Sequence, residues 1–71
     1  MREYAVVFEK TSTGWSAYAP DLPGLGVAGS TYEATEQLIR DGIIFHIEGL
    51  VADGEEVPEP TTRVVQLAIS A

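Results

Sequence analysis

Carboxylates are the side chains best suited to chemistry in this chain of 71 residues, which has 11 aspartates and glutamates against four lysines and arginines. Four of them gather in a proline-broken stretch: Asp53, Glu55, Glu56 and Glu59. Their spacing matches no calcium-binding loop. Two-magnesium catalysis requires carboxylates that converge from neighbouring strands, yet the first predicted strand has only Glu3 and Glu9, near its two ends. The carboxylates therefore predict neither a metal site nor a catalytic one.

The other catalytic residue types are nearly absent. His46 is the only histidine and there is no cysteine, so no Ser/His/Asp or Cys/His set can be assembled. No glycine-rich loop has the spacing of a phosphate-binding motif. Because His46 falls beside the expected core side of a helix, we expect it to be packed rather than to act as a base or ligand. The sequence thus predicts a protein that is not an enzyme and holds no cofactor.

The charge balance limits the classes of partner. The formal net charge is −7, and the cations are few and scattered: Arg2, Lys10, Arg40 and Arg63. Such a field repels nucleic-acid phosphates and membrane surfaces and attracts basic proteins, although acidity also simply keeps a small protein soluble. Trp15 and Tyr18 alternate along a strand, which favours packing over base stacking. With no apolar leader and no apolar run of about 20 residues, we expect a cytoplasmic protein without membrane or nucleic-acid contact.

The hydrophobic pattern predicts four strands and one helix in a single domain, residues 1–71. β-branched and aromatic residues indicate strands at 3–10, 15–19 and 62–70, with a short glycine-rich strand around Val27. Between them, Ser30 and Glu33 have the spacing of a helix capping box, and Gly54 is a left-handed stop. The order β-β-β-α-β predicts an α+β fold in which one helix packs on a mixed four-stranded sheet, with the last strand parallel to the first.

At about 100° per residue, one face of the helix gathers the residues expected to pack on the sheet. These are Ala34, Leu38, Gly42, Phe45 and Gly49, flanked by Ile39, Ile43 and Leu50. Since glycine destabilises a helix by about 1 kcal/mol relative to alanine, Gly42 predicts a place where the helix backbone presses close to the sheet.

Apolar residues remain that one short chain does not cover. The first and last strands are apolar on both sides, and apolar residues interrupt the charged outer arc of the helix. Exposed apolar surface of this kind predicts a partner, and two-fold pairing is the commonest solution. We therefore expect a homodimer or higher oligomer, with these candidate contacts: Ala5, Val7, Ile44, Ile47, Val51, Val64 and Ala68.

A stiff bend joins the second and third predicted strands. Pro20 ends the second strand because it cannot donate to a ladder. Leu22-Pro23-Gly24-Leu25 is typical of a type II turn, in which proline presets the first central residue and glycine permits positive φ at the second. Asp21 is expected to lock the bend by accepting a nearby backbone N–H. The bend is either a structural joint or a recognition loop, and the sequence leaves both interpretations open.

The bend, the helix start and the loop after the helix together resemble a known family. The run GWSAYAPDLPGLGVAGSTYEATEQL, followed by a helix ending near HIEGLVADGEEVPEP, is similar to the HicB-like antitoxins of bacterial and archaeal type II toxin–antitoxin pairs. This resemblance implies a partial RNase H-like fold with strand order 3-2-1-4 and no catalysis. It also implies binding to HicA, a small basic ribonuclease that cleaves mRNA.

On this resemblance, the chain is expected to neutralise a HicA-type toxin by protein–protein contact. Many family members also carry a DNA-binding segment after the last strand, and we expect none here because the chain ends at Ala71. Against a basic toxin, the expected partner-binding residues are acids of the strand ends and loops and the leucine of the bend: Glu9, Asp21, Leu22, Glu55, Glu56 and Glu59. The alternative is a structural homo-oligomer with no toxin partner.

Overall fold

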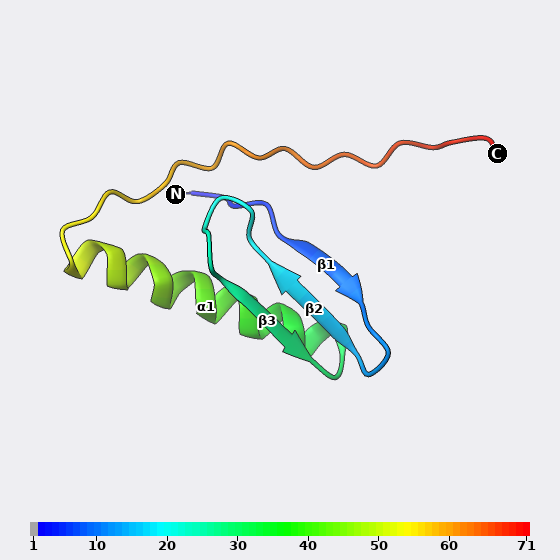
Figure 1. Ribbon diagram of the computed structural model, residues 1–71, viewed down its shortest axis with the longest axis horizontal. Coiled ribbons are helices and arrows are strands. Elements are labelled where there is room, and N and C mark those ends of the chain that lie inside the picture. Colours follow the sequence, from blue (N-terminus) through cyan, green and yellow to red (C-terminus); the bar gives the residue numbers. More distant parts are fainter. Residues whose placement is uncertain (1) are drawn as a thin grey trace.

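Three short strands form an antiparallel meander that one long helix crosses (Figure 1). The computed structural model describes residues 2–71, with β1 at Val7–Lys10, β2 at Trp15–Tyr18, β3 at Gly26–Gly29 and α1 at Tyr32–Ala52. The sheet order is β1-β2-β3, so β2 is central. The α+β class, the presence of the first three strands and the single helix are therefore confirmed. The first strand is shorter than the predicted range 3–10, because only Val7–Lys10 pair in the sheet. No helix within residues 2–71 is both long and apolar enough to cross a membrane.

The register of the sheet separates a face covered by α1 from an open face. Phe8 lies opposite Ala17 and Ala17 opposite Val27, so these three residues share the covered face. Val7 and Tyr18 are opposite each other on the open face. α1 packs mainly across β2 and β3 rather than β1. The enclosed core is correspondingly small, and its members are Ala17, Ala19, Leu22, Thr35 and Ile39.

The helix begins one residue later than its predicted capping box. Thr31, not Ser30, is the N-cap: its backbone is extended, and its Oγ1 accepts a hydrogen bond from Ala34 N at 3.0 Å. The first helical residue is Tyr32, whose ring centroid lies 4.5 Å from that of Phe8. This aromatic contact packs the start of the helix against β1. The capping box predicted from Ser30 is therefore wrong.

The end of the helix follows the prediction. Gly54 has φ +71°, and its N–H donates to Val51 O at 3.1 Å. Glu55 N donates to Leu50 O at 2.9 Å, so the last helical carbonyls are satisfied. The left-handed stop at Gly54 is confirmed.

The predicted core face of α1 is wrong by about a quarter turn. The buried helix residues are Thr35 and Ile39, whereas Leu38 is 45% exposed and Phe45 is 78% exposed. The close approach of β3 to the helix explains why α1 is rotated from its predicted orientation. Gly29 has no side chain, and a Cβ added to it would lie only 2.5 Å from Thr35 Oγ1. Contact between β3 and the first turn of α1, rather than the most hydrophobic arc, sets which side of the helix faces the sheet.

The close approach predicted at Gly42 is confirmed. A Cβ there would lie 3.1 Å from Leu25 Cδ1 and 3.9 Å from Val27 Cγ1. His46, about one helical turn further along the same side, is half-buried. That position agrees with its predicted role as a packed residue.

The fourth strand predicted at 62–70 is not part of this sheet. These residues are exposed, and the sheet of the described chain has three strands only. The physical reason is the path of the preceding loop, which directs the chain away from β1 (Figure 1). Of the predicted order 3-2-1-4, the structure contains 3-2-1.

Candidate functional site

The bend between β2 and β3 consists of two consecutive tight turns. Leu22 N donates to Ala19 O at 3.0 Å, and Leu25 N donates to Leu22 O at 3.3 Å. Gly24 has φ +86°, the positive value that a type II turn requires at its second central residue, so the predicted turn is confirmed. The first central position of each turn is a proline: Pro20 and Pro23.

Leu22 joins the two turns, and its side chain is completely buried. A buried leucine belongs to the core and offers no surface to a partner. The stiff turns on either side of it hold Leu22 in that position.

The prediction that Asp21 accepts a backbone N–H of its own bend is wrong. Its carboxylate instead binds a segment 40 residues further along the chain. Asp21 Oδ2 accepts the backbone N–H groups of Thr61 and Thr62, each at 3.0 Å. Asp21 Oδ1 accepts their hydroxyl groups at 3.2 and 2.7 Å. Pro23, two residues after Asp21, has no N–H to donate. We call these four hydrogen bonds the Asp21 clamp, and they join the bend to residues 61 and 62.

Two further contacts hold the loop after α1 against the start of the chain. The Tyr4 hydroxyl donates to Pro58 O at 2.5 Å, and Arg2 forms an exposed ion pair with Glu59 at 3.3 Å. Glu59 and Asp21 are therefore engaged within the chain.

The clamp lowers the pKa of the Asp21 carboxyl below its ordinary value of 3.8, chiefly through the hydrogen bond from the Thr62 hydroxyl. Since the folded-state pKa is depressed, the clamp stabilises the structure fully above the unfolded value and is lost as the pH falls through the folded-state pKa. We expect Asp21→Asn to abolish this pH dependence, because an amide does not titrate in the range in which a carboxyl group does. NMR titration of the Thr61 and Thr62 amide signals measures the effect, and wild-type signals that do not titrate would contradict it.

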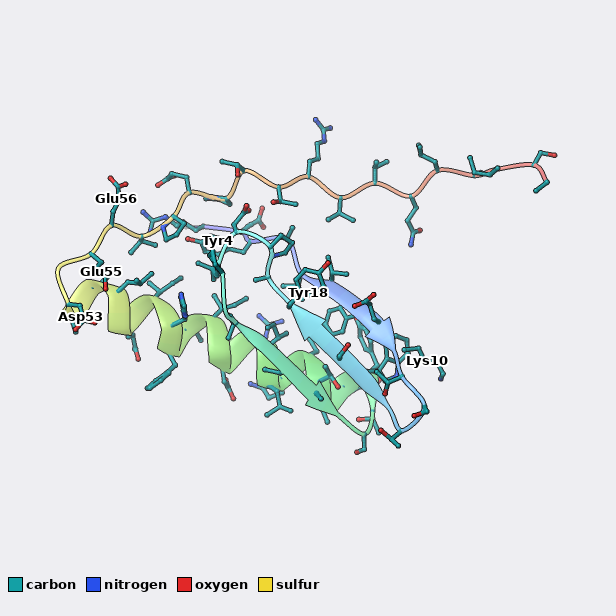
Figure 2. The ribbon with its side chains drawn as sticks, viewed as in Figure 1. Tyr4, Lys10, Tyr18, Asp53, Glu55 and Glu56 are labelled. Carbon is teal, nitrogen blue, oxygen red and sulfur yellow. The ribbon has the colours of Figure 1, made fainter. Side chains whose placement is uncertain are left out.

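Three exposed carboxylates crowd the end of α1: Asp53, Glu55 and Glu56 (Figure 2). We call this group the acidic corner. The last turn of α1 has no basic residue, so these charges lie at the negative end of the helix dipole with nothing to offset them. Within residues 2–71, no ion pair involves a member of the acidic corner. The corner is therefore an unbalanced negative surface that a basic partner would stabilise.

The structure brings only part of the predicted acid set together. Glu55 and Glu56 are neighbours in the acidic corner. Glu9 is exposed in β1 next to Lys10, which lies at the opposite end of the molecule (Figure 2). The acids expected to bind a partner jointly are thus divided between two distant surfaces.

A surface along α1 was not expected from the sequence. Phe45 and Leu38, both assigned to the core, are exposed and lie about two helical turns apart on one side. Asp41 and Glu48 are exposed within one turn of Phe45 and border it. We call these four residues the outer stripe. The flanking acids were the signal, because a core residue seldom has charged neighbours at i−4 and i+3.

The residues predicted for self-association fall on three surfaces. On α1, Ile44 and Val51 are exposed and Ile47 is half-buried. In the first strand and the segment before it, both are half-buried: Ala5 and Val7. In the extended segment after the loop, both are exposed: Val64 and Ala68. No single patch contains them all.

The structure offers little geometry for metal or base recognition. Among the described residues, no three His, Asp or Glu side chains gather closely enough to hold a metal ion. Trp15 packs edge-on against Tyr32, and Lys10 Nζ lies 5.3 Å from the centre of the Trp15 ring. Tyr18 points to the opposite face of the sheet. The two aromatic residues therefore form no common stacking platform.

The comparison with known families identifies the group to which this arrangement belongs. A model of the HicB-like antitoxins of bacterial toxin–antitoxin systems matches residues 4–69, from the Tyr4 anchor to the extended segment. The chain belongs to the HicB-like antitoxin family. The resemblance expected from the bend and the helix start is thereby confirmed. Membership in this family points to a role in a toxin–antitoxin system.

Two relatives are similar over most of the chain. An uncharacterized 14.9 kDa protein from the rep-hol intergenic region of Haemophilus phage HP1 is 38% identical over 56 residues, which cover 79% of this chain and 42% of the phage protein. The UPF0150 protein ssr1765 of Synechocystis sp. is 36% identical over 67 residues, 93% of this chain and 85% of that protein. The chain thus spans less than half the length of the phage protein. No solved structure matches this chain significantly.

Proposed function

We propose that this protein is a non-catalytic antitoxin module that neutralises a small, basic, mRNA-cleaving toxin of HicA type by protein–protein contact. Family membership supports the toxin–antitoxin role. The observation that carries the proposal is the position of the acidic corner at the end of the same helix that displays the outer stripe. Both surfaces are exposed, so one partner can cover them together.

The two surfaces supply different parts of an interface. Phe45 is a large exposed aromatic side chain bordered by Asp41 and Glu48, which is the arrangement of an apolar anchor with a polar rim. The acidic corner and the net charge of −7 attract a basic protein over a longer range. Apolar contact then slows dissociation, while charge speeds encounter.

The test is binding to a purified HicA-type toxin, measured by stopped flow together with inhibition of RNA cleavage. Glu55→Lys combined with Glu56→Lys should lower the association rate about tenfold at low salt, because steering charges are reversed. The reversal should also weaken the salt dependence of that rate. The fold should be unchanged, since exposed loop charges contribute little to stability.

Two further variants make this result specific. Glu9→Lys introduces one of the same charge reversals at the opposite end of the molecule and should change the association rate much less. Phe45→Ala should raise the dissociation rate and leave the association rate almost unchanged. Glu55→Lys alone is the matched single reversal at the acidic corner. If Glu9→Lys slows association as much as Glu55→Lys alone does, net charge alone attracts the toxin and the acidic corner is not the binding site.

The alternative function is a structural homo-oligomer without a toxin, which the many exposed apolar side chains favour. The same experiment separates the two, because a structural oligomer inhibits no RNA cleavage. On the function proposed here, the described residues make no direct contact with nucleic acid, since their acids greatly outnumber their bases.

A further inference from the structure

Arg63 follows the Asp21 clamp, and after it residues 64–71 form an extended arm that is exposed along its whole length. Figure 1 shows the arm diverging from β1. Its large apolar side chains are between 60% and 78% exposed: Val64, Val65, Leu67 and Ile69. No side chain of the arm is charged. An uncharged, apolar, extended segment is a template for strand pairing with another chain.

A groove beside β1 offers a place for such a strand. Its volume is about 480 Å³, and residues of both the N-terminal segment and α1 line it. Three apolar side chains line it from β1 and the residues before it: Tyr4, Val6 and Phe8. Three line it from the helix: Ile39, Ile43 and Ile44. Four charged residues also line it: Arg2, Glu3, Glu36 and Arg40. Within residues 2–71, β1 pairs only with β2, so the outer edge of β1 has free N–H and C=O groups next to this groove.

We propose that the arm of one copy adds as a fourth strand to the β1 edge of a second copy, and that two copies exchange their arms reciprocally. Val65, Leu67 and Ile69 share one side of the extended arm, and this side fills the groove. Gln66 lies on the other side, which stays at the open face of the sheet. A two-fold exchange pairs both arms and both free edges at once.

The Asp21 clamp explains why the arm reaches a second copy rather than its own sheet. Four hydrogen bonds hold Thr61 and Thr62 immediately before the arm begins. They determine the direction in which the arm leaves, and that direction carries it past the β1 edge of its own chain (Figure 1).

The chemistry of the arm also favours a second copy over a basic toxin. The arm has no acidic side chain to recognise a basic protein. The free edge of β1 supplies backbone partners, and the groove supplies apolar ones. The exchange does not involve the acidic corner or the outer stripe, so it stands independently of the toxin-binding function.

Disulfide trapping between chains tests the exchange directly, because the protein has no cysteine of its own. Two variants of the chain are prepared. The first carries Val7→Cys on β1. The second carries one cysteine on the side of the arm that faces away from the groove: Val64→Cys, Gln66→Cys or Ala68→Cys. Mixtures of one β1 variant and one arm variant should form a mixed disulfide, identified by peptide mass. A disulfide that forms only within a doubly substituted chain, and never between singly substituted chains, would overturn the proposal.

Sedimentation equilibrium of the full chain provides the second measurement. The wild type should be a dimer, and Leu67→Lys should raise the dimer dissociation constant by at least about 100-fold, because a charged side chain replaces an apolar one that packs on the apolar part of the groove. Gln66→Lys adds the same charge on the other side of the arm and should change that constant by less than about fivefold. Circular dichroism should show the same fold for both variants. A monomeric wild type would contradict the exchange. So would an equal effect of both variants on the dimer dissociation constant, or a dimer that forms only after toxin is added.

Discussion

Gly14→Ala should destabilise the fold by about 4 kcal/mol or more, which is at the extreme of single substitutions. A Cβ at Gly14 would lie 2.2 Å from Gly29 O and 2.8 Å from Ser30 Cα. Both are backbone atoms, so no side-chain rotation relieves the clash, and the β1–β2 hairpin would have to separate from the junction of β3 and α1. A domain of this length is stable by only roughly 4–10 kcal/mol. We therefore expect loss of most of the folded population, measured by urea denaturation.

Gly49→Ala is the matched control, because it makes the same chemical change in a different environment. Gly49 lies inside α1, and a Cβ there meets nothing within 4 Å. Alanine should stabilise the helix by up to about 1 kcal/mol. The two substitutions should thus shift the unfolding midpoint in opposite directions. A Gly14→Ala protein as stable as the wild type would show that the hairpin does not press against the helix start.

Leu22→Ala should lower the free energy of unfolding by about 3 kcal/mol. Leu22 is completely buried between two turns whose first central residues are Pro20 and Pro23. Because proline restricts φ, these turns cannot collapse into the cavity that alanine leaves. Urea denaturation followed by the fluorescence of Trp15 measures the loss.

Leu38→Ala is the control for this second prediction. Leu38 is 45% exposed on the outer stripe, so the same truncation should change the free energy of unfolding by less than about 1 kcal/mol. Equal losses for the two leucines would mean that the bend is not a core element. The recognition-loop interpretation of the bend would then regain support.

Short-range features were determined by the sequence itself. The turn at Pro23-Gly24 and the helix stop at Gly54 depend on the φ preferences of one or two residues, and both are present as predicted. The α+β class follows from a change of hydrophobic period along the chain, which needs no knowledge of tertiary contacts. The excess of carboxylates likewise restricts the class of partner before any fold is known.

The rotation of α1 was decided only by the tertiary structure. Hydrophobicity placed Phe45 in the core, yet the contact between Gly29 and Thr35 turns Phe45 outward. Small residues that permit close backbone approach contribute little to a hydrophobic pattern, so the pattern pointed to the wrong face. The outer stripe could therefore not be recognised from the periodicity of the helix alone.

The role of Asp21 and the path of the arm were also decided only in three dimensions. The sequence shows that Asp21 is a hydrogen-bond acceptor in a turn, but its partners Thr61 and Thr62 are 40 and 41 residues away. Local preferences predict that residues 62–70 are extended, because their β-branched and apolar side chains favour strands. They do not predict which edge an extended segment pairs with, since every free edge offers the same N–H and C=O groups. That choice depends on the direction in which the Asp21 clamp releases the chain.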